Sequence, residues 1–257
     1  GSRGLGDVYK RQPLLMSKII DRGAKVAPNE EIVTATENGV RRQTYKETRD
    51  RAHQLAHALA DAGIAVGDRV GTFMWNGSRH LEAYQACAGM GAVLHTLNIR
   101  LSEKDLEYII NHAEDQIIIV DADILPLLEK LGGKMPTVRQ VVIATEEGFE
   151  GWSTQLPNAV DYEDFIKDKP THYEWPDIDE NSPLGLCYTS GTTGNPKGVE
   201  YEHRSQYLHT LACSMTDSMA LSATDSVCGI VPMFHAMGWG IPCLLYTSPS
   251  PRDPWKS

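Results

Sequence analysis

The chain has 257 residues, of which 41% are hydrophobic and 23% are charged, and its formal net charge is −10 at pH 7. A globular chain of this length can bury one sizeable core or two smaller ones. An acidic surface disfavours nucleic acid and anionic membranes as partners. The apolar runs all fall short of the roughly 18 residues that suggest a membrane-spanning helix. These bulk properties therefore predict no nucleic-acid partner and no membrane span.

The cysteine pattern indicates the compartment. The four cysteines between the two ends are Cys87, Cys187, Cys213 and Cys228, and none of them belongs to a C-x-x-C pair. Most of them lie in apolar runs, and buried free thiols are the usual state of such residues in a reducing compartment. We therefore expect a cytoplasmic location.

The two ends are not expected to belong to the folded protein. Residues 2–12 and 243–253 can be encoded by DNA strings that are reverse complements over nearly their whole length, as a sequencing-library transposon adapter on both flanks would be. We therefore exclude residues 1–12 and 243–257 from fold prediction. Their exclusion removes five basic and two acidic residues, which changes the formal charge from −10 to −13. Residues 13–242 are expected to be an internal piece of a longer protein. Whether that longer protein carries a targeting signal is left open.

Helices and strands alternate over the first part of this segment. A helix is expected at residues 14–27, followed by two strands, 31–36 and 40–44, that flank the hairpin signal Asn38-Gly39. The capping box Thr44-x-x-Glu47 begins a helix that ends near residue 63. The later strands are expected at 69–75, 92–97, 116–120 and 138–144, with helices at 78–89, 102–113 and 124–131. This alternation predicts an α/β fold with a parallel sheet and flanking helices.

Residues 146–182 form the least regular stretch, rich in prolines and acids. One or two helical turns are expected at 162–167, and the rest is interpreted as a surface connection. Residues 13–182 are therefore predicted to form a first α/β unit. Residues 183–242 are predicted to begin a second, incomplete unit: a strand from Leu184, a helix at 203–221 and a strand at 226–231.

The central motif is LGLCYTSGTTGNPKGV, residues 184–199, an apolar run that breaks into small and hydroxylated residues. Glycine allows backbone angles that turn successive amides towards an anion, hydroxyls add donors, and a lysine brings positive charge to the rim. The spacing fits neither G-x-x-x-x-G-K-[ST] nor G-x-G-x-x-G. A flexible linker is the alternative. The residues predicted to hold a polyphosphate are Thr189, Ser190, Gly191, Thr192, Thr193, Gly194 and Lys197.

Other candidate sites have plain alternatives. His53 and His57 stand four apart on a helix, which is a metal-ligand spacing, but no third ligand is evident and we interpret them as polar-face residues. The acids that bracket the strand 116–120 are interpreted as solvated strand ends: Glu114, Asp115, Asp121 and Asp123.

Two loops follow the apolar ends of strands, where open α/β sheets keep their ligand sites. They are Trp75-Asn76 and residues 98–101. Capping and packing are equally good explanations for both.

The string YTSGTTGNPKG, residues 188–198, resembles the phosphate loop of the adenylate-forming superfamily, which contains acyl-CoA synthetases, luciferases and peptide-synthetase adenylation domains. The stretches MWNGSRHLEAY, GAVLHTLNIRLS, INHAED and VPMFHAMGWGIP resemble the medium- and long-chain fatty acyl-CoA synthetase branch of that superfamily. The resemblance covers residues 14–242 and implies the fold of a truncated N-terminal domain of an acyl-CoA synthetase.

The resemblance implies an ATP-dependent fatty acid–CoA ligase that uses ATP, Mg²⁺ and coenzyme A. A carboxylate attacks the α-phosphorus of ATP to give acyl-adenylate and pyrophosphate, and the CoA thiol then displaces AMP. By the same resemblance Thr189, Lys197 and His235 are catalytic: Thr189 contacts the magnesium, Lys197 offsets phosphate charge and His235 lies by the acyl-adenylate. Trp239 would gate the acyl tunnel, with core packing as its alternative.

Three readings of the function stay open. In the first, the substrate carboxylate is a fatty acid. In the second, it is another acid, such as a short thioether or aryl acid. In the third, the piece is a non-catalytic nucleotide-binding or inert fragment. Amino acids are disfavoured, because His235 follows Phe234 where amino-acid-activating domains usually carry an aspartate. The later motifs of the family are absent, so the chain by itself is expected to be inactive. The full-length enzyme is expected to be capable of forming a homodimer.

Overall fold

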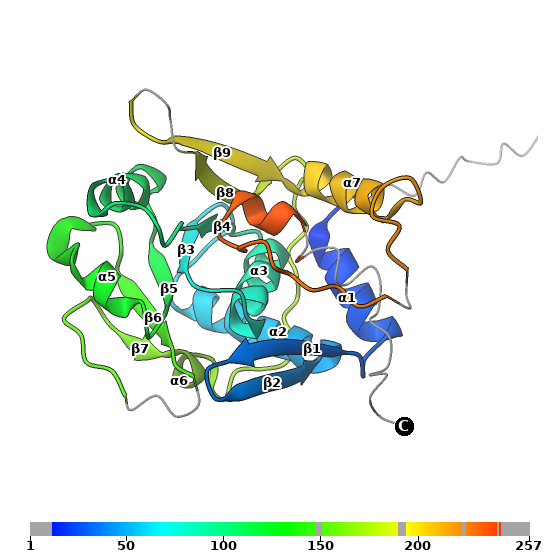
Figure 1. Ribbon diagram of the computed structural model, residues 1–257, viewed down its shortest axis with the longest axis horizontal. Coiled ribbons are helices and arrows are strands. Elements are labelled where there is room, and N and C mark those ends of the chain that lie inside the picture. Colours follow the sequence, from blue (N-terminus) through cyan, green and yellow to red (C-terminus); the bar gives the residue numbers. More distant parts are fainter. Residues whose placement is uncertain (1–11, 147–150, 190–193, 223–224, 241, 243–257) are drawn as a thin grey trace, which may run out of the picture.

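The computed structural model describes residues 12–146, 151–189, 194–222, 225–240 and 242 (Figure 1). Over these residues the strands are β1 (Glu31–Thr36), β2 (Gly39–Thr44), β3 (Arg69–Phe73), β4 (Val93–Thr96), β5 (Ile117–Asp121), β6 (Gln140–Ala144), β7 (Val160–Asp161), β8 (Pro183–Thr189) and β9 (Lys197–Glu202). The helices are α1 (Met16–Val26), α2 (Tyr45–Asp61), α3 (Ser78–Met90), α4 (Glu103–Ala113), α5 (Leu125–Glu129), α6 (Tyr162–Ile166) and α7 (His203–Ser214). Two 3₁₀ helices complete the set, η1 (Gly132–Lys134) and η2 (Ala236–Gly240).

The described strands form a seven-stranded sheet in the order β7-β6-β5-β3-β4-β8-β9, and β1 and β2 form a separate hairpin. All neighbours in the large sheet run parallel except β8 and β9, which are antiparallel. The predicted α/β class with a parallel sheet and flanking helices is confirmed. The antiparallel edge strand β9 was not expected from the sequence.

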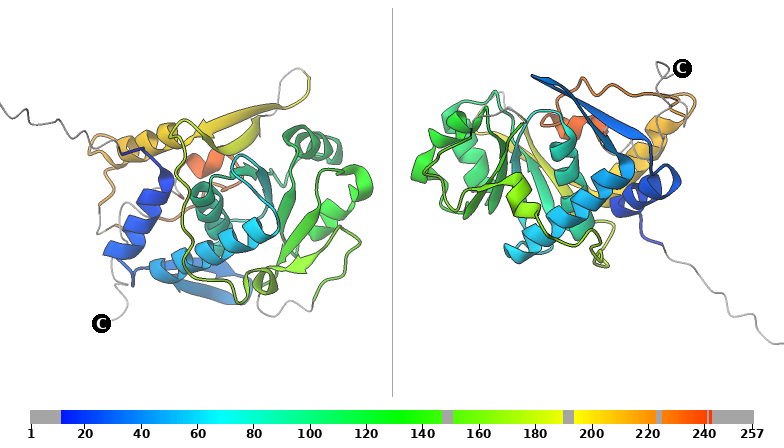
Figure 2. Two further views of the ribbon diagram at one scale, coloured as in Figure 1. Left: turned by 180° about the vertical axis from the view of Figure 1, so that it is seen from behind. Right: turned by 90° about the horizontal axis from the view of Figure 1, so that it is seen from below.

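The sheet separates two apolar cores, because side chains of a strand alternate between its faces. Ile117 and Ile119 of β5 pack with α2 and α3, whereas Ile118 and Val120 pack with α4 and α5. All four are fully buried. Figure 2 shows these two pairs of helices on opposite faces of the sheet. A strand buried on both faces must be apolar at every position, as this one is.

The structure corrects two expected elements near the end of the segment. The helix predicted at 203–221 ends at Ser214, where Met215 adopts an extended conformation and Thr216, Asp217 and Ser218 follow. These three residue types favour turns over helix interiors. The strand predicted at 226–231 is not formed. A strand needs hydrogen-bonding partners along its length, and no described strand pairs with this segment.

The connection over residues 146–182 also differs in detail. The expected helical turn is present as α6, and a two-residue strand, β7, precedes it at the sheet edge. A strand this short leaves no alternation for sequence reasoning to detect. After the connection, β8 joins the same sheet beside β4. The division of the chain at residue 183 into two units stays a prediction.

Within the part of the chain that the structure describes, none of the helices combines the length and the apolar character that spanning a membrane requires.

Candidate phosphate and acyl site

The β8–β9 hairpin carries the phosphate-loop motif. Thr189 ends β8, Lys197 begins β9, and the two residues are direct cross-strand partners. Both are exposed, and the Thr189 hydroxyl donates a 3.5 Å hydrogen bond to the Lys197 carbonyl oxygen. Gly194 lies between them with φ of +101°, a conformation that favours glycine. Thr189 and Lys197 therefore mark the two ends of the loop.

The central part of the predicted phosphate cradle lies outside the described residues: Ser190, Gly191, Thr192 and Thr193. Its two ends are nevertheless held by close packing. A Cβ atom at Gly198 of β9 would lie only 3.2 Å from Leu186 and 3.3 Å from Tyr188, both on β8. The hairpin can therefore present a loop of amides and hydroxyls with one ammonium group at its rim, a chemistry suited to phosphate oxygens.

The predicted acyl-substrate segment packs against the same hairpin. Phe234 is buried, whereas His235, directly before η2, is exposed. A Cβ atom at Gly185 of β8 would overlap the Met237 side chain, so η2 approaches β8 as closely as a glycine allows. Figure 1 shows η2 in orange beside β8 and β4. The structure thus brings the segment of His235 next to the strand that leads into the phosphate loop.

The turn after His235 is left-handed. The φ angles of Ala236, Met237 and Gly238 are 45°, 54° and 59°. For residues with a Cβ atom this conformation costs roughly 1–2 kcal/mol each, and such strain persists only where the surrounding structure enforces it. Trp239 follows in this turn, and the placement of its side chain lies outside what the structure describes.

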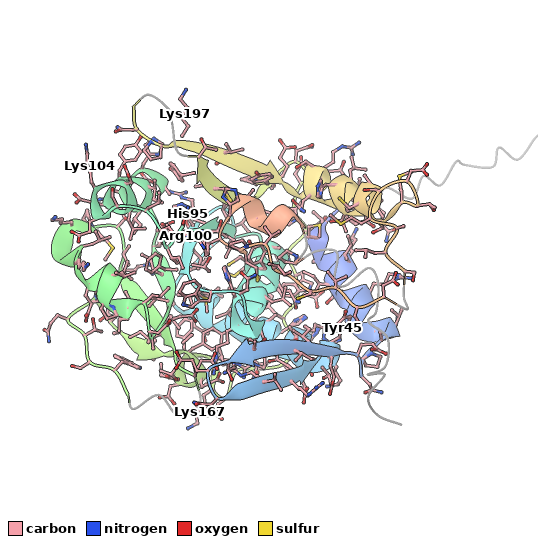
Figure 3. The ribbon with its side chains drawn as sticks, in the orientation of Figure 1. Tyr45, His95, Arg100, Lys104, Lys167 and Lys197 are labelled. Atoms are coloured by element: carbon pink, nitrogen blue, oxygen red, sulfur yellow. The ribbon has the colours of Figure 1, made fainter. Side chains whose placement is uncertain are left out.

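A buried histidine–aspartate pair lies behind the hairpin and was missed by sequence reasoning. Nδ1 of His95 on β4 is 2.7 Å from Oδ2 of Asp115, and both side chains are fully buried. Burial is the main cause that raises the pKa of Asp115, and His95 opposes it. The His95 ring also lies 5.1 Å from the ring of Tyr188, two residues before the loop. Figure 3 labels His95 and Lys197.

The expectation that Asp115 is a solvated strand end was therefore wrong. Glu114 ends α4 with φ of 56°, and this left-handed cap directs the next residue into the protein, where the Asp115 amide donates to the Ile110 carbonyl. The available signal was His95 itself: a polar residue inside an otherwise apolar strand needs a buried partner.

A second group of acids meets Trp75 at the carboxyl ends of β3 and β5. The Trp75 amide donates to Asp121 at 2.7 Å, and its indole donates to Asp123 at 2.8 Å. The pKa of Asp121 is raised to about 7, chiefly by burial and also by Asp123 and Glu146, against the opposing effects of the Trp75 hydrogen bond and Arg79. These residues line a cavity of about 550 Å³ between the sheet and the β1–β2 hairpin.

The second loop after a strand end, residues 98–101, forms a local turn. The Arg100 amide donates to the Asn98 side chain at 2.9 Å. This is a local turn in which an asparagine side chain accepts from the backbone two residues on. It does not decide between the two explanations that the sequence left open.

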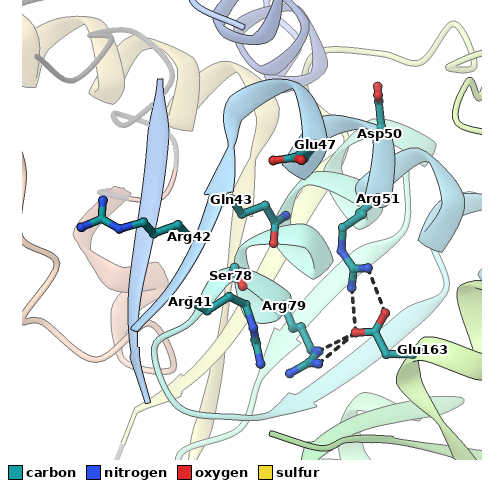
Figure 4. A pocket seen from close by; sticks show the side chains of 9 residues that line it. All are labelled: Arg41, Arg42, Gln43, Glu47, Asp50, Arg51, Ser78, Arg79 and Glu163. Atoms are coloured by element: carbon teal, nitrogen blue, oxygen red, sulfur yellow. Dashed lines mark hydrogen bonds and ion pairs between the residues drawn. The ribbon is translucent and has the colours of Figure 1, made fainter. Parts of the chain in front are cut away.

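An arginine-lined pocket of about 310 Å³ lies between β2, α2, α3 and α6 (Figure 4). Arg51 forms two 2.9 Å hydrogen bonds with Glu163 and one of 2.8 Å with the buried Glu82. Arg79 donates to Glu163 at 2.9 Å, and Arg41 pairs with Glu146. Because carboxylates already occupy these guanidinium groups, the pocket is suited to joining elements rather than to binding an anion.

Among the described residues, the helical histidine pair belongs to no group of three or more potential metal ligands. His53 accepts a 2.7 Å hydrogen bond from the Tyr173 amide, and Nε2 of His57 lies 2.8 Å from the His172 carbonyl oxygen. The expectation that both lie on a polar face was wrong for His53, which is 3% exposed. The connection over residues 171–175 covers it, a long-range contact that helical spacing does not reveal.

The sequence matches the AMP-binding enzyme family over residues 20–248, most of the chain. The chain belongs to the AMP-binding enzyme family. Its membership confirms the adenylate-forming superfamily that the motif at residues 188–198 predicted.

Known AMP-binding enzymes resemble the chain in sequence and in fold. It is 42% identical over 239 residues to a medium-chain-fatty-acid–CoA ligase of Ectopseudomonas oleovorans, covering 93% of this chain and 43% of that protein. It is 43% identical over 232 residues to a 3-methylmercaptopropionyl-CoA ligase of Ruegeria pomeroyi, covering 90% and 43%. The crystal structure of the anthranilate CoA ligase AuaEII with anthranoyl-AMP superposes with a TM-score of 0.79 at 23% identity, covering 95% of this chain and 46% of that one. The chain thus spans less than half the length of these AMP-binding enzymes.

Proposed function

We propose that the chain is the nucleotide-phosphate-binding part of an ATP-dependent fatty acid–CoA ligase of the cytoplasm. A carboxylate oxygen of the substrate attacks the α-phosphorus of ATP and expels pyrophosphate, and the CoA thiol then loses its proton and displaces AMP. The observation that carries the proposal is the β8–β9 hairpin, which sets Thr189 opposite Lys197 at the two ends of the glycine- and threonine-rich loop. The resemblance to CoA ligases supports the overall reaction.

The roles of the residues follow from the chemistry of the reaction. The substrate carboxylate is its own nucleophile, so no general base is needed and catalysis consists mainly of positioning and charge neutralisation. The amides and hydroxyls of the loop hold the β- and γ-phosphates, and Lys197 offsets the charge that moves onto pyrophosphate. Among the described residues no exposed acid pairs with the Lys197 ammonium group, so its charge is available.

Magnesium fits this site as a companion of the nucleotide. Mg²⁺ usually binds through substrate phosphates, waters and one or two protein oxygens. The described residues contain no cluster of acids, histidines or cysteines that would hold it alone, whereas the exposed Thr189 hydroxyl offers one oxygen at the end of the loop. When bound, the ion would neutralise phosphate charge.

The acyl side of the site is the segment around η2. We assign His235 to the neighbourhood of the acyl-adenylate and Trp239 to the acyl tunnel. A fatty acid is the first choice of carboxylate because of the medium-chain relative. A short thioether acid is the second choice, because the 3-methylmercaptopropionyl-CoA ligase matches at the same level of identity.

The test is Lys197→Ala in the complete protein. Because Lys197 interacts most strongly when negative charge has moved to the departing pyrophosphate, we expect adenylation to slow about a hundred- to thousand-fold, the usual loss for one such donor. The second half-reaction, from supplied acyl-adenylate and CoA, contains no pyrophosphate and should keep its rate. Pre-steady-state kinetics of each half-reaction measures both.

The matched control is Lys167→Ala. Lys167 is also exposed and lies on the far side of the molecule from Lys197 (Figure 3), so it should change neither half-reaction. Equal damage to both half-reactions by Lys197→Ala, or none to adenylation, would show that the hairpin loop does not hold the phosphates. Comparing rates with a medium-chain fatty acid and with 3-methylmercaptopropionate separates the two carboxylates.

A further inference from the structure

The side chain of Asn76 is hydrogen-bonded to a segment more than 150 residues away. Its amide nitrogen donates to the carbonyl oxygens of Gly229 and Val231 at 2.8 and 2.9 Å. Its amide oxygen accepts from the Met233 amide at 2.7 Å. One side chain thus satisfies three backbone groups of residues 229–233, a segment that has no strand partner in the described structure.

Asn76 is itself held in place on both sides. The preceding residue, Trp75, donates its amide to Asp121 at the end of β5. On the other side the Ser78 amide donates to the Thr34 hydroxyl of β1 at 3.0 Å. The loop between β3 and α3 is therefore anchored to the sheet and to the hairpin, and Asn76 projects from a rigid support.

The segment that Asn76 and Tyr84 hold by hydrogen bonds ends at Met233, two residues before His235. The Tyr84 hydroxyl of α3 donates to the Met233 carbonyl at 2.5 Å, and the His235 amide donates to Pro232 at 3.0 Å. The strained left-handed turn at Ala236 and Met237 follows immediately. A strained turn keeps its shape only when the surrounding structure fixes it. Here Asn76 and Tyr84 fix the flank before the turn, and the contact of Met237 with β8 holds the turn itself.

We propose that Asn76 is a positioning residue for the carboxylate substrate: its side-chain amide holds residues 229–233 and thereby sets the place of His235 and of the turn that follows. Asn76 touches no reacting atom in this scheme and acts through the segment it holds. The assignment to the carboxylate side rests on the proposed function, whereas the clamp itself rests on the three hydrogen bonds.

The first experiment is independent of any activity. Hydrogen exchange of the Met233 and His235 amides is measured in this chain for wild type, Asn76→Ala, Asn76→Asp and Tyr84→Phe. Loss of the Asn76 bonds should speed exchange of these amides by at least about tenfold, the equivalent of one net hydrogen bond. Asn76→Asp keeps an oxygen that accepts from the Met233 amide. It replaces the donating NH₂ group by a carboxylate oxygen, which repels the carbonyl oxygens of Gly229 and Val231, so the segment should still loosen.

The matched control is Asn111→Ala on α4. Asn111 donates a 2.8 Å hydrogen bond to the Lys134 carbonyl, which is the same type of contact elsewhere in the fold. It should leave exchange at residues 233–235 unchanged. If Asn76→Ala fails to fold, Asn76→Asp and Tyr84→Phe carry the measurement. Unchanged exchange in every variant that folds would overturn the clamp.

The second experiment uses the complete ligase. Asn76→Ala should raise KM for the carboxylate about tenfold, in step with the loosened segment, and leave KM for ATP within about twofold. A general loss of structure would move both constants. Equal changes in both constants, or faster exchange with an unchanged carboxylate KM, would overturn the positioning role. If the complete protein makes no acyl-CoA, the proposed function fails, and the exchange data still decide whether Asn76 holds the segment.

Discussion

At the scale of single residues, Asp121 shows how position changes the chemistry of a side chain. Its pKa is raised to about 7, first by burial and then by Asp123 and Glu146, whereas the unfolded value is close to 3.9. Between these values the folded state binds a proton that the unfolded state has released. The stabilisation from this proton is complete below about pH 4 and is lost as the pH rises through 7.

Asp121→Asn should therefore stabilise the protein at pH 8 and change little at pH 4. An asparagine oxygen still accepts from the Trp75 amide and carries no charge to desolvate. We expect a gain of about 1–3 kcal/mol at pH 8, less than the full linkage value because the residue is partly exposed. Urea unfolding at pH 4, 6 and 8 measures it. A pH-independent effect of Asp121→Asn would contradict the assignment.

At the scale of elements, α3 is shaped by one close contact. Gly89 lies in the last turn of α3, and a Cβ atom there would lie 2.5–2.7 Å from the ring of Trp175. Trp175 belongs to the connection before β8 and packs on His53 of α2 with ring centroids 4.3 Å apart. The glycine thus lets the connection lie flat against two helices, although a glycine inside a helix costs about 1 kcal/mol relative to alanine.

Gly89→Ala should destabilise the protein by about 1–3 kcal/mol, because the overlap with Trp175 outweighs the gain in helix propensity. The matched control is Gly133→Ala in η1, where a Cβ atom meets nothing within 4 Å, and it should be neutral. Urea unfolding measures both variants. A stabilised Gly89→Ala variant would show that the connection moves aside at no cost.

At the scale of the whole molecule, two apolar cores lie on either side of one sheet, and a third apolar surface faces outward on α7. Leu208 and Leu211 lie three residues apart on α7 and are 44% and 47% exposed, and Met215, the residue after the end of the helix, is 64% exposed. Single exposed apolar residues are normal, but a contiguous row of them marks a surface that binds other apolar groups.

We therefore expect the folded chain to bind the dye 8-anilinonaphthalene-1-sulfonate on this face. The double variant Leu208→Ser/Leu211→Ser should lower the dye fluorescence at least about twofold, with its unfolding free energy within about 0.5 kcal/mol per site of wild type. The control is Val66→Ser, an exposed apolar residue outside α7, which should change neither. Equal fluorescence of wild type and double variant would locate the dye site elsewhere.

Much of the fold and part of the candidate site could be predicted from the sequence, because the signals are local. The capping box is present as predicted, with Thr44 and Glu47 in reciprocal hydrogen bonds. The apolar run at 116–120 is a strand buried on both faces. The motif at 188–198 identified the family correctly, and it selected Thr189 and Lys197, whose roles stay a proposal. Each of these signals lies within a few residues of the feature that it predicts.

Only the tertiary structure decided what depends on partners distant in the chain. Residues 226–231 have strand-like composition but pair with no described strand, and Asn76 donates instead to the carbonyl oxygens of Gly229 and Val231. The hydrogen-bond partner of the buried Asp115 carboxyl group is His95, which lies 20 residues away in the chain. The physical reason is common to both cases. A buried backbone or carboxylate group must be satisfied by some donor or acceptor, and a single sequence does not show which distant residue the fold will bring to it.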